Sequence, residues 1–255
     1  MNMQKMGALI GVELKKLYRD PITLAVLVLM PVGLTVIYYL ALGDITDNDY
    51  YPVPGMNHFE YLLPGTMGYA IIYMGMMVAL ALSEYREAGL LKRLESTPTS
   101  PYEYLGSLII AYAIIAVFQA LVVLLVARLL GYEPQGGLVG LLLACVFLAL
   151  LGATAVGLGL LTATVAKNSG AASGLAVIFI VPMMMFGSFL AVFNEMTRNI
   201  ARFMPNYYVT DSLSIIFQQD SVSDPVIWQN LLILALITLV IVVGGIQLFK
   251  RTEFR

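Results

Sequence analysis

Residues 138–165 read LVGLLLACVFLALLGATAVGLGLLTATV, a run without any charged side chain that is long enough to cross a bilayer as a helix. Apolar and polar residues do not alternate in this run, so it does not fit a strand of an outer-membrane β-barrel. Five further uncharged apolar runs cover residues 22–42, 65–83, 105–127, 171–193 and 226–249. The sequence therefore predicts an all-α integral membrane protein, with six transmembrane helices in a single transmembrane domain over residues 1–255.

The composition of the whole chain agrees with this prediction. Of its 255 residues, 60% belong to the hydrophobic set and only 12% are charged, whereas about a quarter are charged in ordinary soluble domains. These values exclude a soluble globular protein and a disordered chain. Six spans also leave no room for a large enzymatic domain outside the membrane, and the single cysteine, Cys145, excludes an intramolecular disulfide.

Several helix starts can be predicted from local sequence. Asp20-Pro21 and Asp224-Pro225 each place a capping side chain before a proline, and Ser100-Pro101 is followed by Glu103 in the spacing of a capping box. Before the first span, residues 2–18 carry leucine and isoleucine at helical spacing, with lysines elsewhere around the turn. This pattern predicts an amphipathic helix that lies in the membrane interface. A signal peptide is disfavoured, because the apolar run that follows is too long for one.

Lysine and arginine are unevenly distributed among the connections between the spans. All except Arg128, Arg198 and Arg202 fall before the first span, after the second and fourth spans, or after the sixth. Short loops rich in these residues remain cytoplasmic, so both termini of this multi-pass protein are expected in the cytoplasm. The first loop on the opposite side carries four carboxylates between residues 44 and 60 and neither lysine nor arginine.

The sequence shows no constellation typical of catalysis. Its single histidine, His58, falls in a polar loop and is interpreted as a solvated residue. No segment fits the GxxxxGK[ST] loop that cradles nucleotide phosphates. We therefore expect a chain that is not an enzyme and that has no catalytic residue, metal site or cofactor of its own. The middles of the spans lack ionisable residues, which disfavours an ion-coupled carrier, and no nucleic-acid partner is expected.

Polar and small residues within the spans leave alternatives open. Gln119 could hydrogen-bond across a helix interface, which we favour, or face a substrate. Pro182 frees a backbone hydrogen bond and is expected to kink the fifth span. Its neighbours Met183, Met184 and Phe186 could line an adaptable apolar pathway or simply pack. Gln119 and these three residues are the candidate substrate pathway. Small residues, including Gly75 and the pair Ala155/Gly159, permit close helix packing, either within one subunit or at a dimer seam.

Residues 84–100 lie between the second and third spans and carry charges of alternating sign. Leu90, Leu91 and Leu94 are predicted on one face of a short helix there. Composition alone leaves two interpretations open: an amphipathic helix that rests on the lipid headgroups, or a helix that docks onto a partner.

Several motifs in this region and beyond it resemble one family. Arg86-Glu87-Ala88-Gly89, Thr97-Pro98 and Glu103-Tyr104-Leu105-Gly106 are similar to the signature of membrane subunits of type-2 ATP-binding cassette (ABC) transporters. The start of the second span, residues 59–65, and the segment from Glu13 to Pro21 also resemble that family, as does the stretch between Pro182 and Tyr208. One departure is Ser107, which stands where the family often has a basic residue.

The resemblance implies a permease in the plasma membrane of a prokaryote, surrounded by membrane lipids. It would pair with a second permease subunit, commonly an identical copy, and with separate ABC ATPase subunits that bind ATP and magnesium. The family's cytoplasmic coupling segment would correspond to residues 84–100, and residues 194–225 would form an external re-entrant segment that does not cross. The residues carried over as the coupling site are Glu84, Arg86, Glu87, Gly89, Leu90, Arg93, Leu94, Thr97 and Pro98.

Two functions are therefore compared below. The first is an ATP-driven ABC exporter that moves an amphipathic, drug-like or lipid-like substrate outward. The alternative is a non-transporting membrane scaffold or assembly factor with the same fold, which would bind the ATPase without substrate flux.

Overall fold

The computed structural model describes residues 3–46, 56–95, 99–189, 195–219 and 221–253, which form helices and contain no strand. Six helical segments are long and apolar enough to cross a membrane. The expected all-α protein with six candidate membrane-spanning helices is thus confirmed. The elements are α1 (Met3–Arg19), α2 (Pro21–Leu42), α3 (His58–Glu87), α4 (Leu90–Glu95), α5 (Pro101–Leu129), α6 (Gly137–Val165), α7 (Ser169–Met184), the π-helix η1 (Met185–Phe189), α8 (Glu195–Ala201), α9 (Pro205–Gln218) and α10 (Pro225–Glu253).

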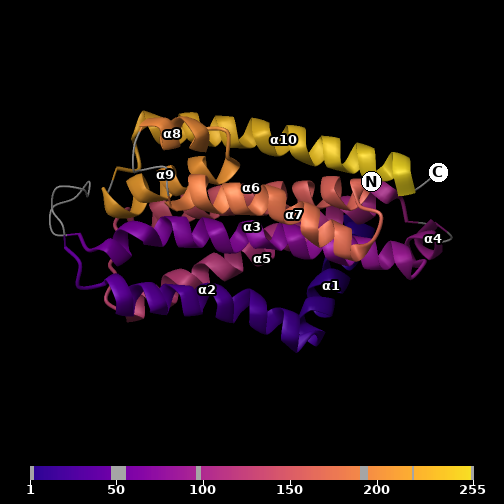
Figure 1. Cartoon of the computed structure of the whole chain (residues 1–255), viewed down its shortest axis with the longest axis horizontal. Helices are drawn as coiled ribbons and strands as arrows, with labels where there is room; N and C mark the ends of the chain where they lie inside the picture. The colour runs from indigo at the N-terminus through magenta and orange to yellow at the C-terminus, as the bar shows by residue number, and fades with distance from the viewer. Residues whose placement is uncertain (1–2, 47–55, 96–98, 190–194, 220, 254–255) are drawn as a thin grey trace.

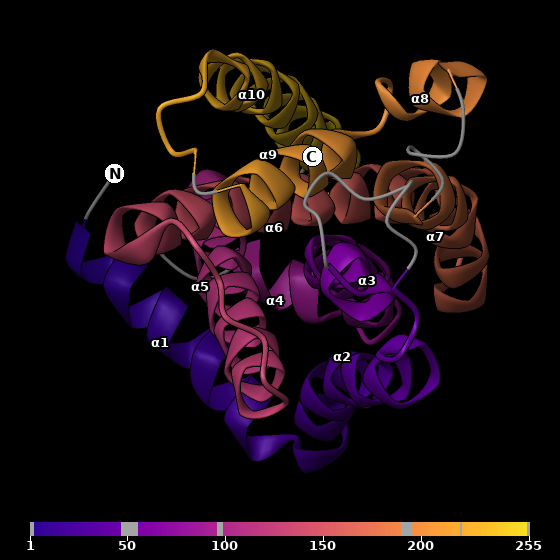
Figure 2. The ribbon, with the colours of Figure 1, turned by 90° about the vertical axis from the view of Figure 1, so that its left-hand side faces the viewer.

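The long helices lie side by side in an elongated bundle, with α4 and the last turn of α10 at one end and α8 and α9 at the other (Figure 1). Helix α3 packs against α2, α5, α6, α7 and α9 and forms the centre (Figure 2). In its most apolar stretch 67% of the residues are buried, against 17% in α2 and in α10. The outer faces of α2 and α10 are therefore apolar surfaces that this chain itself does not cover.

Helices α3 and α6 pack closely in the core. A Cβ atom added to Gly75 would lie 2.7 Å from the carbonyl oxygen of Ala155, and one added to Gly159 would lie 2.6 Å from the carbonyl oxygen of Gly75. Only glycine permits this approach, because a real Cβ would force the two backbones apart. The small residues that could have formed a dimer seam are thus used within one subunit.

The capping pairs predicted from the sequence begin helices as expected. The backbone N–H of Thr23 donates to Asp20 Oδ1 at 3.1 Å at the start of α2, and Ser100 and Glu103 form a capping box at the start of α5. The backbone N–H of Val226 donates to Asp224 Oδ1 at 2.8 Å at the start of α10.

The prediction that His58 belongs to a polar loop is wrong. Asn57 and Glu60 form a second capping box, in which each side chain accepts a hydrogen bond from the other residue's backbone N–H. Two donors at the helix start are satisfied in this way, so α3 begins at His58, well before the apolar run at residue 65.

The region predicted as an external re-entrant segment contains two short helices, α8 and α9, at the end opposite α4 (Figure 1). Helix α9 has 14 residues, which at 1.5 Å per residue is about 21 Å and too short for the roughly 30 Å hydrocarbon core. It nevertheless contributes the buried side chains Val209, Leu213 and Ile216 to the core.

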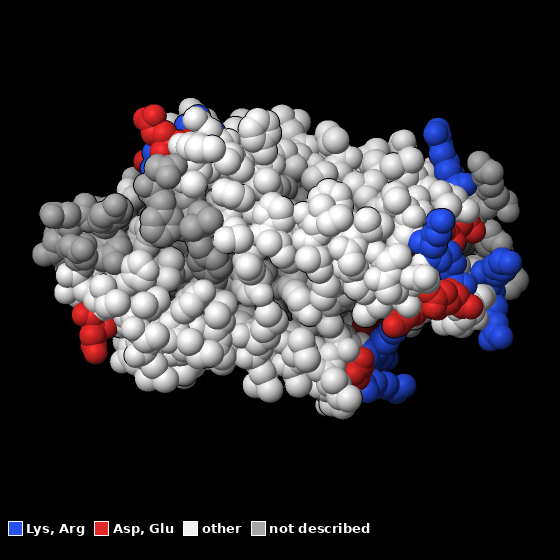
Figure 3. Space-filling model, viewed as in Figure 1, with Lys and Arg blue, Asp and Glu red and all other residues white. Residues whose placement is uncertain are grey.

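Charged side chains gather at the two ends of the bundle, and the surface between them is almost uncharged (Figure 3). The blue side chains of lysine and arginine concentrate at the α4 end in this view. Helix α1 also belongs to this end, where Leu14 and Leu17 pack against the core while Lys5 and Lys15 are exposed. The first helix is thus amphipathic, as its sequence pattern predicts.

Candidate functional site

The candidate site is the turn that follows α3. Glu84, Arg86 and Glu87 belong to the last turn of α3, and α4 begins after only Ala88 and Gly89. Gly89 has φ of +70°, with no atom within 4 Å of the position of a Cβ. Glycine is therefore needed for the left-handed backbone that ends the helix and not for close packing.

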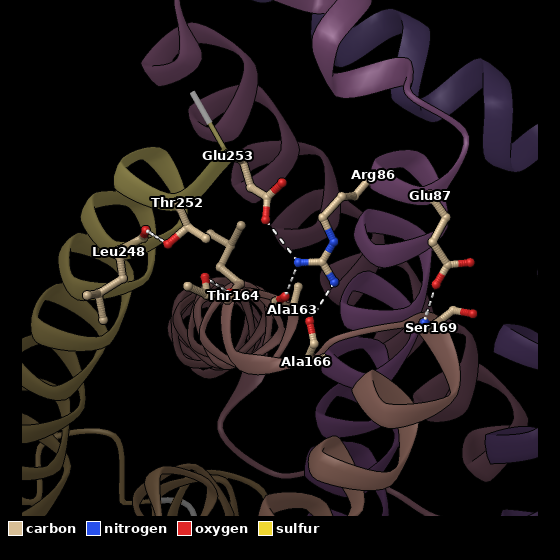
Figure 4. Close-up of polar contacts among 10 residues, drawn as sticks. Arg86, Glu87, Ala163, Thr164, Ala166, Ser169, Leu248, Thr252 and Glu253 are labelled. Atoms are coloured by element: carbon tan, nitrogen blue, oxygen red, sulfur yellow. Dashed lines mark hydrogen bonds and ion pairs between the residues drawn. The ribbon is translucent and has the colours of Figure 1, made fainter. Parts of the chain in front are cut away.

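Arg86 points away from α4 and into the body of the protein. Its Nη1 donates to the carbonyl oxygen of Ala163 at 3.0 Å and to Glu253 Oε1 at 2.9 Å, and its Nη2 donates to the carbonyl oxygen of Ala166 at 2.6 Å (Figure 4). The two carbonyls belong to the end of α6, where intrahelical donors run out. A positive charge is also favourable at a helix C-terminus. Arg86 thus caps α6 and ties it to the last turn of α10.

Glu87 makes the complementary contact with the next helix. Its Oε1 accepts a hydrogen bond at 2.6 Å from the backbone N–H of Ser169, the first residue of α7 (Figure 4). Asn168 caps the same helix by accepting from the N–H of Ala171 at 2.7 Å. A carboxylate is favourable at a helix N-terminus. Two consecutive residues of opposite charge therefore hold both sides of the turn between α6 and α7.

The predicted coupling residues divide into two sets. Arg86 and Glu87 face the α6–α7 turn, as described above. On α4, Leu90 is 44% exposed, and Lys92 and Arg93 are exposed as well. Thr97, Pro98 and the side chain of Leu94 lie outside the described residues.

Glu84 is also exposed, and it lines a cavity beside α1.

The prediction that the leucines of α4 share one face is only partly correct. Leu91 is 3% exposed and joins the core cluster that includes Leu82 and Leu105, whereas Leu90 points outward. Leu91 thus anchors α4 to the bundle. Among the described side chains of α4, the exposed ones are apolar Leu90 and basic Lys92 and Arg93.

A family model described as "ABC-2 type transporter" matches residues 4–217 of the chain. The chain belongs to this family. The match extends from α1 through α9 and includes the whole α3–α4 turn, so the resemblance found in the motifs is confirmed. The protein is accordingly a membrane permease and not a nucleotide-binding domain. No curated protein matches the chain.

Gln119 of this ABC-2 permease lies at the interface of α5 with α2. Its Nε2 donates to the carbonyl oxygen of Leu27 at 2.5 Å, and its side chain is buried. Leu27 precedes Pro31 by four residues, so its carbonyl has no helical N–H to accept from, since proline lacks one. Gln119 supplies the missing donor, which supports the structural interpretation of this residue.

The other candidates for the substrate pathway lie apart from Gln119, on α7 and η1. Met183 is 3% exposed, whereas Met184 and Phe186 are half-buried. Helix α7 continues through Pro182 and becomes a π-helix at Met185. This run packs against α3 and α9, and Figure 2 places α5 and α7 on different sides of α3. The four residues do not converge on one site.

Asn206, which sequence reasoning did not single out, holds the C-terminal end of α7. Its Nδ2 donates to the carbonyl oxygen of Met183 at 2.7 Å and to Ser188 Oγ at 2.8 Å, and a Cβ on Gly187 would collide with its amide. The π-helix is thus locked to α9 by one buried amide. π-helical turns frequently occur at functional sites.

Proposed function

We propose that this ABC-2 permease is the membrane subunit of an ATP-driven exporter, with the α4 end in the cytoplasm and α4 docked on a separate ABC ATPase. The gathering of lysine and arginine at the α4 end (Figure 3) supports this orientation. ATP and magnesium would be bound by the ATPase. The chain would lie in the plasma membrane of a prokaryote, with both termini cytoplasmic.

One observation carries the proposal: the residues beside α4 are hydrogen-bonded to three other helices. Arg86 and Glu87 connect the end of α3 to α6, α7 and α10. A movement of α4 is passed through the end of α3 to these helices, because hydrogen bonds made by charged groups are short and strong. Arg86 and Glu87 thus transmit the movement, and the exposed residues of α4 receive it.

The apolar faces of α2 and α10 supply contacts for the other expected partners. Ile22, Leu29 and Leu40 on α2 are between 65% and 77% exposed, and Leu232, Leu236 and Val240 on α10 are between 63% and 71% exposed. In a membrane such surfaces contact lipid tails or another helix. We infer that lipids and a second copy of the permease cover them, and that an amphipathic, drug-like or lipid-like substrate crosses at the interface of the two copies.

The test is reconstitution of the permease in liposomes with a candidate ABC ATPase from the same organism. ATP turnover and the efflux of a panel of amphipathic compounds are measured. Leu90→Asp on α4 should lower both, while Leu129→Asp, which changes a 79% exposed leucine at the other end, should not. Failure of the ATPase to associate would refute the proposal. Association and turnover without flux of any compound would instead favour the scaffold.

A further inference from the structure

A cavity of about 300 Å³ lies between α1, α2, α3 and α5, near the α4 end of the bundle. The apolar part of its lining, called the apolar wall below, includes Met77 and Ile115. The charged part, called the charged wall, is formed by Glu13, Lys16, Asp20 and Glu84. A cavity with both kinds of lining matches an amphiphile better than a fully polar or fully apolar molecule.

The charges of this wall do not cancel, because three carboxylates face a single ammonium group. Lys16 Nζ lies 4.0 Å from Glu13 Oε2 and 3.9 Å from the centre of the Tyr85 ring. Glu84 and Asp20 are close enough to act on the same ammonium electrostatically. An ammonium ion over an aromatic ring is attracted by the ring's negative face. The carboxylates and the ring therefore attract a cation at the place that Lys16 now occupies.

The Lys16 ammonium group can leave its position over the Tyr85 ring. Its side chain is 50% exposed, so the flexible stem can carry the ammonium group out to solvent. Burial lowers the pKa of Lys16, and the neighbouring carboxylates only partly offset this effect. The charged lysine thus gives up hydration to stay in the cavity, whereas an amphiphilic ammonium ion offsets the same loss by burying its hydrocarbon part against apolar side chains.

We propose that this cavity binds an amphiphile with an ammonium headgroup, which displaces Lys16 from Tyr85 and lies among Glu13, Asp20 and Glu84 while its hydrocarbon part packs on the apolar wall. Anionic headgroups are excluded, because three carboxylates repel them. The ammonium group has two sources, phosphatidylethanolamine from the surrounding leaflet or a free cationic amphiphile. This binding needs neither the ATPase nor transport, so it can fail or hold independently of the proposed export.

The test is photo-crosslinking of the purified full-length chain, in a neutral maltoside detergent, with an alkylammonium probe that carries a diazirine in its chain. Probes with the same chain and a glucoside or sulfate headgroup serve as comparisons. We expect labelling by the ammonium probe alone, on peptides that contain residues 13–23 and 77–85. Labelling of these peptides by all three probes would overturn the proposal, since the headgroup would then play no part.

Variants give the sharper result, because they are expected to shift binding in opposite directions. Glu84→Gln should lower the affinity for the ammonium probe about fivefold, the scale of one partly exposed ion pair. Lys16→Met should raise that affinity by a similar factor, since the competing ammonium group is gone. Lys15→Met, on the exposed face of the same helix, should leave binding unchanged. Weaker binding in Lys16→Met, or unchanged binding in Glu84→Gln, would overturn the proposal.

Added phospholipid identifies the source of the ligand. Competition by phosphatidylethanolamine, with none by phosphatidylglycerol, supports the site with a membrane lipid as its occupant. If neither lipid reduces the labelling, the site is supported and its occupant is a free cationic amphiphile. Competition by phosphatidylglycerol as strong as that by phosphatidylethanolamine would overturn the proposal, because the phosphate and not the ammonium would then be recognised.

Discussion

Removal of the Arg86 side chain should destabilise the junction of α3, α6 and α10. Arg86→Ala eliminates three hydrogen bonds, to Ala163, Ala166 and Glu253. The Glu253 side chain is only 9% exposed, so its carboxylate would remain with little access to water. Loss of one partner of a buried ion pair costs about 3–5 kcal/mol. Because the Arg86 side chain is 23% exposed, we expect the lower end, about 3 kcal/mol.

The change can be measured as the thermal midpoint of the purified permease, followed by circular dichroism. A loss of 1 kcal/mol lowers the midpoint by about 2–4 °C in a chain of this size, so Arg86→Ala should lower it by roughly 6–12 °C. Glu253→Ala and the double variant complete a double-mutant cycle, in which we expect a coupling energy of about 2 kcal/mol. Lys92→Ala is the control, since it removes an exposed cation from the adjacent α4.

Two results would refute this account of Arg86. The first is a midpoint of Arg86→Ala that equals that of Lys92→Ala. The second is strict additivity of the Arg86→Ala and Glu253→Ala effects, because two residues joined by a hydrogen bond of 2.9 Å must show coupling.

Three further predictions can be checked with the same thermal measurement. Gly75→Ala should cost about 1–3 kcal/mol because its Cβ would lie 2.7 Å from the α6 backbone, whereas Gly174→Ala, with open space around it, should cost nothing. Gln119→Leu should cost about 1–3 kcal/mol, and Pro31→Ala should restore much of the loss by returning a backbone N–H to the carbonyl that Gln119 now serves; absence of this rescue would contradict the assigned role. Burial raises the pKa of Glu13 above its ordinary value of 4.5, so the unfolded chain ionises first as the pH rises through 4.5, and stability falls with rising pH there. Glu13→Gln should remove this slope.

The sequence was sufficient for the features that depend on local chemistry. Uncharged runs predicted the six spans, and the capping pairs at residues 20, 100 and 224 predicted where helices begin. The same reasoning could have found the start of α3, because Asn57 and Glu60 have the spacing of Ser100 and Glu103. The apolar pattern alone begins only at residue 65 and therefore leaves His58 in a loop.

Contacts between residues far apart in the sequence cannot be predicted from local sequence patterns. The partners of Arg86 lie 77, 80 and 167 residues away, so the motif can nominate Arg86 as a candidate site residue but does not predict that it faces inward. Gln119 likewise serves a carbonyl 92 residues away. Predicting this bond requires knowledge of which helix packs against α5. Local periodicity does not contain that information, and the structure supplies it.

The most direct test of the central claim is a crosslink from α4 to the ATPase. In a Cys145→Ser background the chain has no other cysteine, so a single reactive thiol can be placed by Leu90→Cys, or by Leu129→Cys at the opposite end. A thiol-to-amine crosslinker is then applied to membranes that contain the assembled complex. The account predicts that Leu90→Cys is joined to the ATPase and that Leu129→Cys is not. A complex that copurifies intact yet crosslinks through Leu129→Cys and not through Leu90→Cys would contradict it.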